Sequence, residues 1–244
     1  MKLIVIGSNS AGNSYALDAG GEILLLEAGC KMPEVKKAIN YRLNDVVGCV
    51  VSHAHGDHAK YAVEYAKFGV KVYCNEDIAS KKQFPYDSSS VVRDGITKKI
   101  GSFRVTPFDV AHDVPCLGFL IKLPNGSILM FVTDTYKVPM NITGIDHYLI
   151  EANYSDALLK QNVWDGKINR AQADRIMLSH MSLDYTVKYL SDCGARNART
   201  VTLCHLSERN SDPAQFKSAV ESALGVPCNI ARKGLVVELN KEVI

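Results

Sequence analysis

The sequence predicts an α/β (α+β) protein in which two β-sheets pack against each other and helices lie on the outside. Short apolar or β-branched segments dominate the first 150 residues. In the last third of the chain, helical segments are mixed with further strands. No linker-like stretch divides the chain, so we expect a single domain over residues 1–244.

The expected strands of the first part are compact runs that resemble half-buried or buried strands. They are residues 3–6, 15–17, 23–27, 46–52, 70–74, 103–110, 117–123, 127–133 and 148–151. Between two of them, Asn125-Gly126 is a strong hairpin signal. We expect helices over residues 33–40 and 58–68, with Gly69 placed to end the second helix.

The last third contains helical patterns and fewer strands. Helices are expected over 170–178, 183–192 and 213–224, and strands over 199–204, 229–231 and 235–239. The third helix has a clear beginning, because Asp212 can cap it and Pro213 fits its first position. Residues 83–95, with Pro85 and three consecutive serines, are expected to form a long surface loop, which in a compact domain is often functional.

Composition narrows the class of protein. With 47% hydrophobic and 22% charged residues the chain is globular, and its net charge of +2 does not by itself indicate a nucleic-acid or membrane partner. Seven cysteines without a C-x-x-C pair make neither a disulfide framework nor a structural zinc site. The apolar run at the N-terminus is too short for a signal peptide. No apolar stretch in the sequence approaches the roughly 18 residues that are needed to span a membrane. We therefore expect a cytoplasmic protein without a membrane partner.

Three of the seven histidines lie within six positions, directly after an apolar strand. If His53 and His55 stay extended, their side chains point the same way and can bind one ion together. Asp57 and His58 follow Gly56, where the chain can turn, and can face a second ion. Imidazole and carboxylate ligands are typical of Zn²⁺, Mn²⁺ or Fe²⁺, so the cluster predicts a metal site.

Two ions need more ligands than this cluster supplies. His112, Asp134 and His205 each lie at or just after the end of an apolar strand. Taken singly, each is more often a helix cap or a satisfied polar group than a ligand. Asp134 is the candidate for a bridge, because a carboxylate can bind two cations through its two oxygens.

The His-x-His-x-Asp-His pattern after a hydrophobic strand resembles the signature of the metallo-β-lactamase superfamily. The resemblance covers almost the whole chain. Four segments are similar to the YycJ/VicX-like branch, which is related to ribonuclease Z: residues 7–15, 151–154, 179–182 and 205–207. The resemblance implies a four-layer αββα sandwich, the metallo-β-lactamase fold, with the site at the edge that both sheets share.

The resemblance also implies a ligand set. The first metal would be held by His53, His55 and His112, the second by Asp57, His58 and His205, with Asp134 between them. His180 resembles the histidine that supports the transition state or donates a proton in the ribonuclease Z group. Glu27 stands where many members carry an aspartate that orients the metal loop without binding metal, and we expect it to do the same. His147 matches none of these motifs and is interpreted as structural.

The implied chemistry is hydrolysis with two divalent metal ions, zinc foremost and Mn²⁺ or Fe²⁺ as alternatives. Two cations can bring the pKa of a shared water near neutrality and so create a hydroxide nucleophile. Asp57 would hold this nucleophile or accept its proton, in addition to binding metal. His180 would protonate the leaving alkoxide.

Two residues differ from those found in other groups of the superfamily, and each disfavours one type of reaction. His55 stands where the flavodiiron proteins carry Glu, which disfavours oxygen or nitric-oxide reduction. Asp134 stands where many true β-lactamases carry Cys, which disfavours antibiotic hydrolysis. The favoured function is that of a phosphodiesterase or nuclease acting on DNA or RNA. The alternatives are a small-molecule hydrolase for a thioester, lactone or cyclic phosphodiester, and a metal-binding regulatory protein without activity. The oligomeric state stays open.

Overall fold

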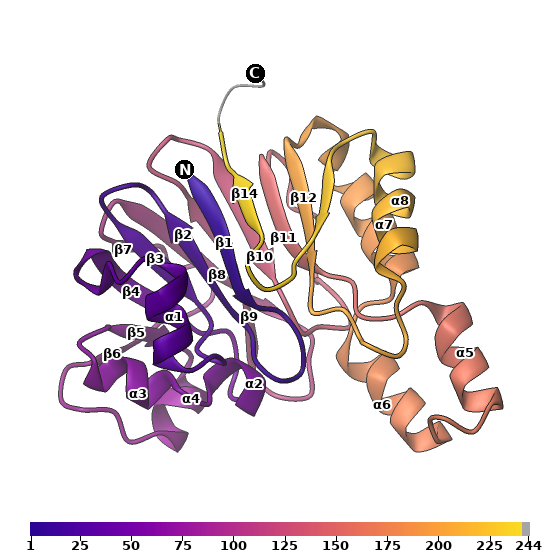
Figure 1. The fold of residues 1–244 in the computed structure, drawn as a ribbon, viewed down its shortest axis with the longest axis horizontal. Helices are drawn as coiled ribbons and strands as arrows, with labels where there is room; N and C mark the ends of the chain where they lie inside the picture. Colours follow the sequence, from indigo (N-terminus) through magenta and orange to yellow (C-terminus); the bar gives the residue numbers. More distant parts are fainter. Residues whose placement is uncertain (241–244) are drawn as a thin grey trace.

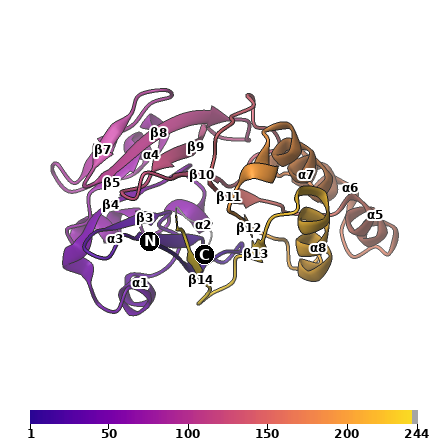
Figure 2. The ribbon, with the colours of Figure 1, turned by 90° about the horizontal axis from the view of Figure 1, so that it is seen from above.

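Two seven-stranded sheets face each other in the computed structural model, which describes residues 1–240 (Figures 1 and 2). Sheet A has the order β14-β1-β2-β3-β4-β5-β6, which is Val236–Glu238, Lys2–Gly7, Ser14–Asp18, Ile23–Leu26, Val46–Val50, Val72–Cys74 and Ser89–Val91. Sheet B has the order β13-β12-β11-β10-β9-β8-β7, which is Cys228–Ile230, Thr200–Cys204, His147–Glu151, Ile128–Val132, Cys116–Lys122, Phe103–Val110 and Lys98–Ile100.

Helices lie on the outer sides of both sheets, although none within residues 1–240 covers β7, β8 and β9 (Figure 2). On the side of sheet A lie α1 (Met32–Ala38), α2 (Gly56–Ala59), α3 (Ala62–Lys67) and α4 (Glu76–Lys81). Sheet B is covered by α7 (Leu183–Asp192) and α8 (Pro213–Leu224). A further pair, α5 (Asp156–Trp164) and α6 (Arg170–Ser179), projects beyond this layer (Figure 1). Short 3-10 turns occupy Leu43–Asp45 and Ala195–Asn197. The predicted four-layer αββα arrangement is confirmed.

Strand β3 shows why the apolar runs became buried strands. Leu24 and Leu26 face the core between the two sheets, whereas Ile23 and Leu25 face the helices outside sheet A. Since strand side chains alternate between faces, a strand covered on both sides needs apolar residues at every position. All seven cysteines are likewise buried and unpaired. None of the helices within residues 1–240 combines the length and apolar character that a membrane crossing requires.

Local signals predicted several boundaries correctly. The Asn-Gly turn at 125–126 joins the antiparallel strands β9 and β10 as expected. Gly69, with φ of +85°, follows the end of α3. The predicted loop at 83–95 was wrong in part, because β6 lies within it and pairs with β5. Helices α4 and α5 and strand β7 were not predicted.

The predicted helix over residues 58–68 is also wrong in its continuity, because it is divided into α2 and α3. In an unbroken helix the amide of Tyr61 would donate to the carbonyl of Asp57. That carbonyl instead accepts from the amide of Asn13 at 2.7 Å, and Tyr61 donates to the carbonyl of Ala28 at 2.9 Å. Contacts with the N-terminal turn therefore interrupt the helix and hold the loop that carries the histidine cluster.

Candidate metal centre

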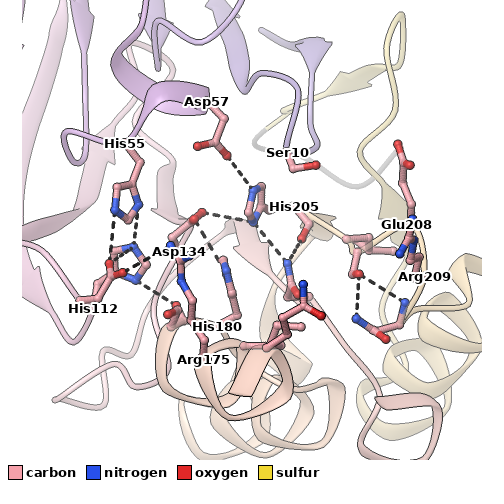
Figure 3. A pocket seen from close by; sticks show the side chains of 18 of the residues that line it. Ser10, His55, Asp57, His112, Asp134, Arg175, His180, His205, Glu208 and Arg209 are labelled. Carbon is pink, nitrogen blue, oxygen red and sulfur yellow. Dashed lines mark hydrogen bonds and ion pairs between the residues drawn. The ribbon is translucent and has the colours of Figure 1, made fainter. Parts of the chain in front are cut away.

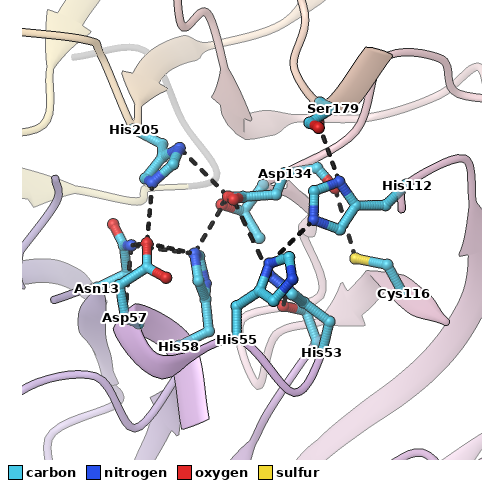
Figure 4. A network of polar contacts seen from close by, with 12 residues as sticks. Asn13, His53, His55, Asp57, His58, His112, Cys116, Asp134, Ser179 and His205 are labelled. Carbon is cyan, nitrogen blue, oxygen red and sulfur yellow. Dashed lines mark hydrogen bonds and ion pairs between the residues drawn. The ribbon is translucent and has the colours of Figure 1, made fainter. Parts of the chain in front are cut away.

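The candidate residues lie where consecutive parallel strands end. In sheet B, β10, β11 and β12 run parallel, and Asp134, Glu151 and His205 lie at or just after their carboxyl ends. In sheet A, β3 and β4 run parallel and are followed by Glu27 and His53. Because parallel strands end at the same edge of a sheet, each sheet brings its polar residues together, and the two sets meet (Figure 4).

The first group of donor atoms consists of three imidazoles and one carboxylate. Atoms of His53, His55, His112 and Asp134 lie within 4.8 Å of one another. Nδ1 of His55 is 3.2 Å from Nε2 of His53 and 3.3 Å from Nε2 of His112. Three imidazole nitrogens thus converge on one point beside a carboxylate, as a tetrahedral metal site requires.

A second group adjoins the first. Atoms of Asp57, His58, Asp134 and His205 also lie within 4.8 Å of one another. Nε2 of His58 is 3.1 Å from Oδ1 of Asp134, and Nε2 of His205 is 3.2 Å from Oδ2 of Asp57. The other oxygen of Asp134 faces the first group, 3.9 Å from Nε2 of His53. Asp134 therefore belongs to both groups, one oxygen toward each.

The donor chemistry fits bound cations. Nδ1 of His112 lies 3.0 Å from the carbonyl oxygen of Ser179, which can only accept, so Nδ1 carries the proton and Nε2 presents a lone pair to the first group. Nδ1 of His205 lies 3.0 Å from a carboxylate oxygen of Glu151, which likewise favours a lone pair on Nε2, facing Asp57. Lone pairs of imidazole and carboxylate that face each other are held together by a proton or a cation.

The electrostatics of the second group of donor atoms also favour a bound cation. Burial lowers the pKa of His205, but Asp134, Asp57 and Glu151 outweigh it and raise the pKa to about 10. Burial opposes ionisation of Asp134 as well, yet the imidazoles of His205 and His58 hold its pKa well below the usual range. A field that binds protons this firmly also attracts divalent cations, which would displace those protons.

The turn between β1 and β2 contacts the loop that carries the histidine cluster through Asn13. The side-chain amide of Asn13 lies 3.2 Å from Oδ2 of Asp57 and 3.1 Å from Nε2 of His58, and Asn13 is fully buried. Gly29 allows this packing, because a Cβ there would lie 1.8 Å from the carbonyl oxygen of Asp57. The resemblance covered this turn but implied no role for Asn13. The Gly/Ser-rich spacing was the available signal.

Glu27 lies beneath the same loop. Its carboxylate accepts from the amide of Ser52 at 3.2 Å, and its other oxygen is 3.6 Å from Nδ1 of His58. The residue is fully buried, with a left-handed φ of 63°, and burial raises its pKa. The longer side chain thus reaches the loop backbone and approaches His58 from outside the second group.

Glu151 is the most consequential residue that sequence reasoning missed. Its carboxylate, fully buried at the end of β11, lies 2.7 Å from Nδ1 of His180 and 3.0 Å from Nδ1 of His205. It also accepts from the amide of Met181 at 3.0 Å. Burial lowers the pKa of His180, but Glu151 outweighs burial and the net pKa is raised. The available signals were its place at the end of an apolar strand and the resemblance of residues 151–154 to the related branch.

A cavity of about 700 Å³ opens over both groups (Figure 3). His180, at the end of α6, lines it together with His55, Asp57, His112, Asp134 and His205. One face of α6 forms a wall, since Gln172, Arg175, Ile176 and Ser179 all line the cavity at helical spacing. Arg209, from the loop after β12, adds a second guanidinium. His147 lies at the other end of β11, outside this cavity, with Nδ1 2.9 Å from Oγ1 of Thr200.

Comparisons with known proteins agree with this geometry. The family model described as the beta-lactamase superfamily domain matches residues 17–206. The chain is 28% identical over 227 residues to the exodeoxyribonuclease WalJ of Streptococcus pneumoniae serotype 2, covering 86% of this chain and 83% of that protein. It is 26% identical over 235 residues to the exodeoxyribonuclease YycJ of Bacillus anthracis, covering 90% and 88%. The crystal structure of the metallo-beta-lactamase fold protein YhfI from Bacillus subtilis superposes with a TM-score of 0.76 at 18% identity, covering 97% and 99%.

Proposed function

Since the chain belongs to the metallo-β-lactamase superfamily and is a metal-dependent hydrolase, we propose that it is a phosphodiesterase that hydrolyses DNA with two divalent cations. The observation that carries the proposal is the pair of donor groups that share Asp134, next to His180 in one cavity. The names of the two relatives support DNA as the substrate. RNA is the nearest alternative, because both carry the same phosphodiester.

The first cation would be held by His53, His55 and His112, the second by Asp57, His58 and His205, and Asp134 would contact both. When bound, such cations supply a nucleophile at neutral pH by lowering the pKa of water, and they stabilise the charge that develops on the phosphate oxygens. Zinc suits this donor set best, and Mn²⁺ or Fe²⁺ would also fit. Asp57, which lines the cavity, would also orient the attacking group or accept its proton.

His180 would act as the general acid. Because Glu151 accepts from Nδ1, the ring is held with Nε2 free to donate a proton to the leaving oxygen. Glu151 outweighs burial and raises the pKa of His180, which favours the protonated imidazole that this role requires. The guanidinium groups of Arg175 and Arg209 line the same cavity and would hold phosphate oxygens on either side of the scissile bond.

The test is hydrolysis of bis-p-nitrophenyl phosphate and of end-labelled DNA and RNA oligonucleotides by protein loaded with Zn²⁺ or Mn²⁺. We expect cleavage of the chromogenic ester and of DNA, and its loss when a chelator is added. Turnover of a thioester or lactone without any diester hydrolysis would contradict the proposal in favour of a small-molecule hydrolase. A fully loaded protein that turns over none of these substrates would instead indicate a regulatory metal-binding protein.

A further inference from the structure

A second cleft, of about 510 Å³, adjoins the cavity over the metal centre. Both are lined by Leu206, Ser207 and Glu208. The turn after β1 also contributes to both, with Ser10 in the first cavity and Asn9 in the second cleft. This turn and the loop after β12 thus line both hollows.

The second cleft lies at the seam between the two sheets. Gly7 at the end of β1 in sheet A and Ile230 of β13 in sheet B both line it. In Figure 1 this seam runs between α1 and α8, beside the loop that joins β13 to β14. The wall toward the metal centre is firm, because the amide of His205 donates to Oγ of Ser8 at 3.0 Å. The two hollows therefore share this wall.

The cleft carries a small excess of positive charge. It is lined by Lys31, Arg232 and Lys233, against Glu34 and Glu208. Lys233 forms an ion pair with Glu34. Within residues 1–240, no carboxylate lies within ion-pair distance of Lys31 or Arg232, and both side chains are exposed.

The remaining lining suits the other parts of a nucleotide. The ring of Tyr61 and the side chain of Pro213 offer surface to a sugar or base. The hydroxyl of Ser211, which donates to the carbonyl oxygen of Ser207, can accept a further hydrogen bond. Aromatic surface beside unpaired cations is the usual combination in grooves that bind single-stranded nucleic acids. The volume is that of a site for a small organic unit and far exceeds what one ion needs.

We propose that this seam cleft binds the backbone of a single nucleic-acid strand whose scissile phosphate lies in the metal centre, an inference that rests on the proposed function. Lys31 and Arg232 would each contact a phosphate beyond the cleaved bond. Phosphate contacts of this kind fix the position of a strand without reading its sequence. They would also explain how a chain with a net charge of only +2 holds a polyanion.

The test compares the double variant Lys31→Ala/Arg232→Ala with a matched control, Arg104→Ala/Lys122→Ala. Arg104 and Lys122 are exposed register partners on β8 and β9, and Lys122 lies at the opposite end of β9 from Cys116, which contacts Asp134. Each double variant removes one lysine and one arginine. Wild type and both variants are assayed with a DNA dinucleotide and with a dodecamer, and dodecamer binding is followed by fluorescence anisotropy in chelator.

We expect the seam variant to lower the kcat/KM ratio of dodecamer to dinucleotide about tenfold, and to reduce the slope of log K against log salt by about 1.4, the value for two phosphates of a single strand. The control should keep both values. The proposal would be refuted if the seam variant had the same salt slope and the same kcat/KM ratio as the control. It would also be refuted if the seam variant lost kcat/KM equally on the dodecamer and on the dinucleotide. Wild-type protein that cleaves no oligonucleotide would instead refute the proposed function, before any variant is compared.

Discussion

Strand β11 carries a buried ionisable side chain at each end, and the two ends differ in kind. His147 begins the strand with 1% of its surface exposed, and Glu151 ends it fully buried. Nδ1 of His147 contacts the hydroxyl of Thr200, whereas Glu151 lies between the imidazoles of His180 and His205.

The comparison shows that burial alone does not set the character of a histidine. At the amino end, desolvation outweighs Asp146 and lowers the pKa of His147 to about 4. At the carboxyl end, burial acts in the same direction, yet carboxylates outweigh it and raise the pKa of His180 and His205. One end of the sheet therefore excludes positive charge, and the other end concentrates acceptors that attract it.

The largest expected effect comes from removing the carboxylate that both donor groups share. Asp134→Ala should weaken both metal sites together and lower hydrolysis to the level seen with chelator, because each group loses an oxygen ligand. Elemental analysis measures the metal content of the purified protein. The control is His147→Gln, on β11 next to β10, which should have the metal content of the wild type. An Asp134→Ala protein that retains one full metal equivalent would contradict the shared position of Asp134.

His180→Ala should leave the metal content unchanged and reduce the rate on DNA by about 10² or more, as expected for loss of a general acid. The loss should be smaller on bis-p-nitrophenyl phosphate, since nitrophenolate leaves without needing a proton. Rate and metal content are measured on the same preparation. Loss of a metal equivalent would make His180 a ligand, which its place beside Asp134, Glu151 and His205 also permits.

The histidine cluster could be predicted from sequence because its members are local. His53, His55, Asp57 and His58 lie within six positions, so their convergence depends on one loop. Asp134 and His205 follow strands far apart in the chain. Their places after apolar strands made them candidates, but only the resemblance assigned them to particular ions. Glu151 was not assigned, because no local pattern shows that a strand's last residue faces two histidines.

The fold was predictable to a similar extent and for a similar reason. Strands buried on both faces, such as β3, are continuous apolar runs. Strand β6 was missed because it is half-buried and contains two serines, which are weak strand formers. The break between α2 and α3 depends on hydrogen bonds to Asn13 and Ala28, which belong to a distant part of the sequence.

A moderate effect is expected from Glu27→Gln, which keeps the size of the side chain and removes its charge. Because Glu27 approaches His58 from outside the donor group, the affinity of the second metal should fall about tenfold, the lower end for partners of metal ligands. Competition with a chromophoric chelator measures both affinities. Glu22→Gln, at an exposed carboxylate that contacts Ser102, is the control. A weaker first site with an intact second site would contradict this placement of Glu27.

The smallest effect is expected from His147, at the amino end of β11, on the pH dependence of the free energy of unfolding. The effect is absent at neutral pH. The folded-state pKa of His147 lies below the unfolded value of about 6.5, so between about pH 6.5 and about pH 4 only the unfolded chain binds this proton. Stability should therefore fall as the pH falls through this window, by about 2 kcal/mol at about pH 5 from this residue alone. His147→Gln removes that contribution while the histidines of the metal centre titrate in both proteins. Urea unfolding in chelator at several pH values measures the difference, and parallel pH profiles of wild type and variant would show that burial does not keep His147 neutral.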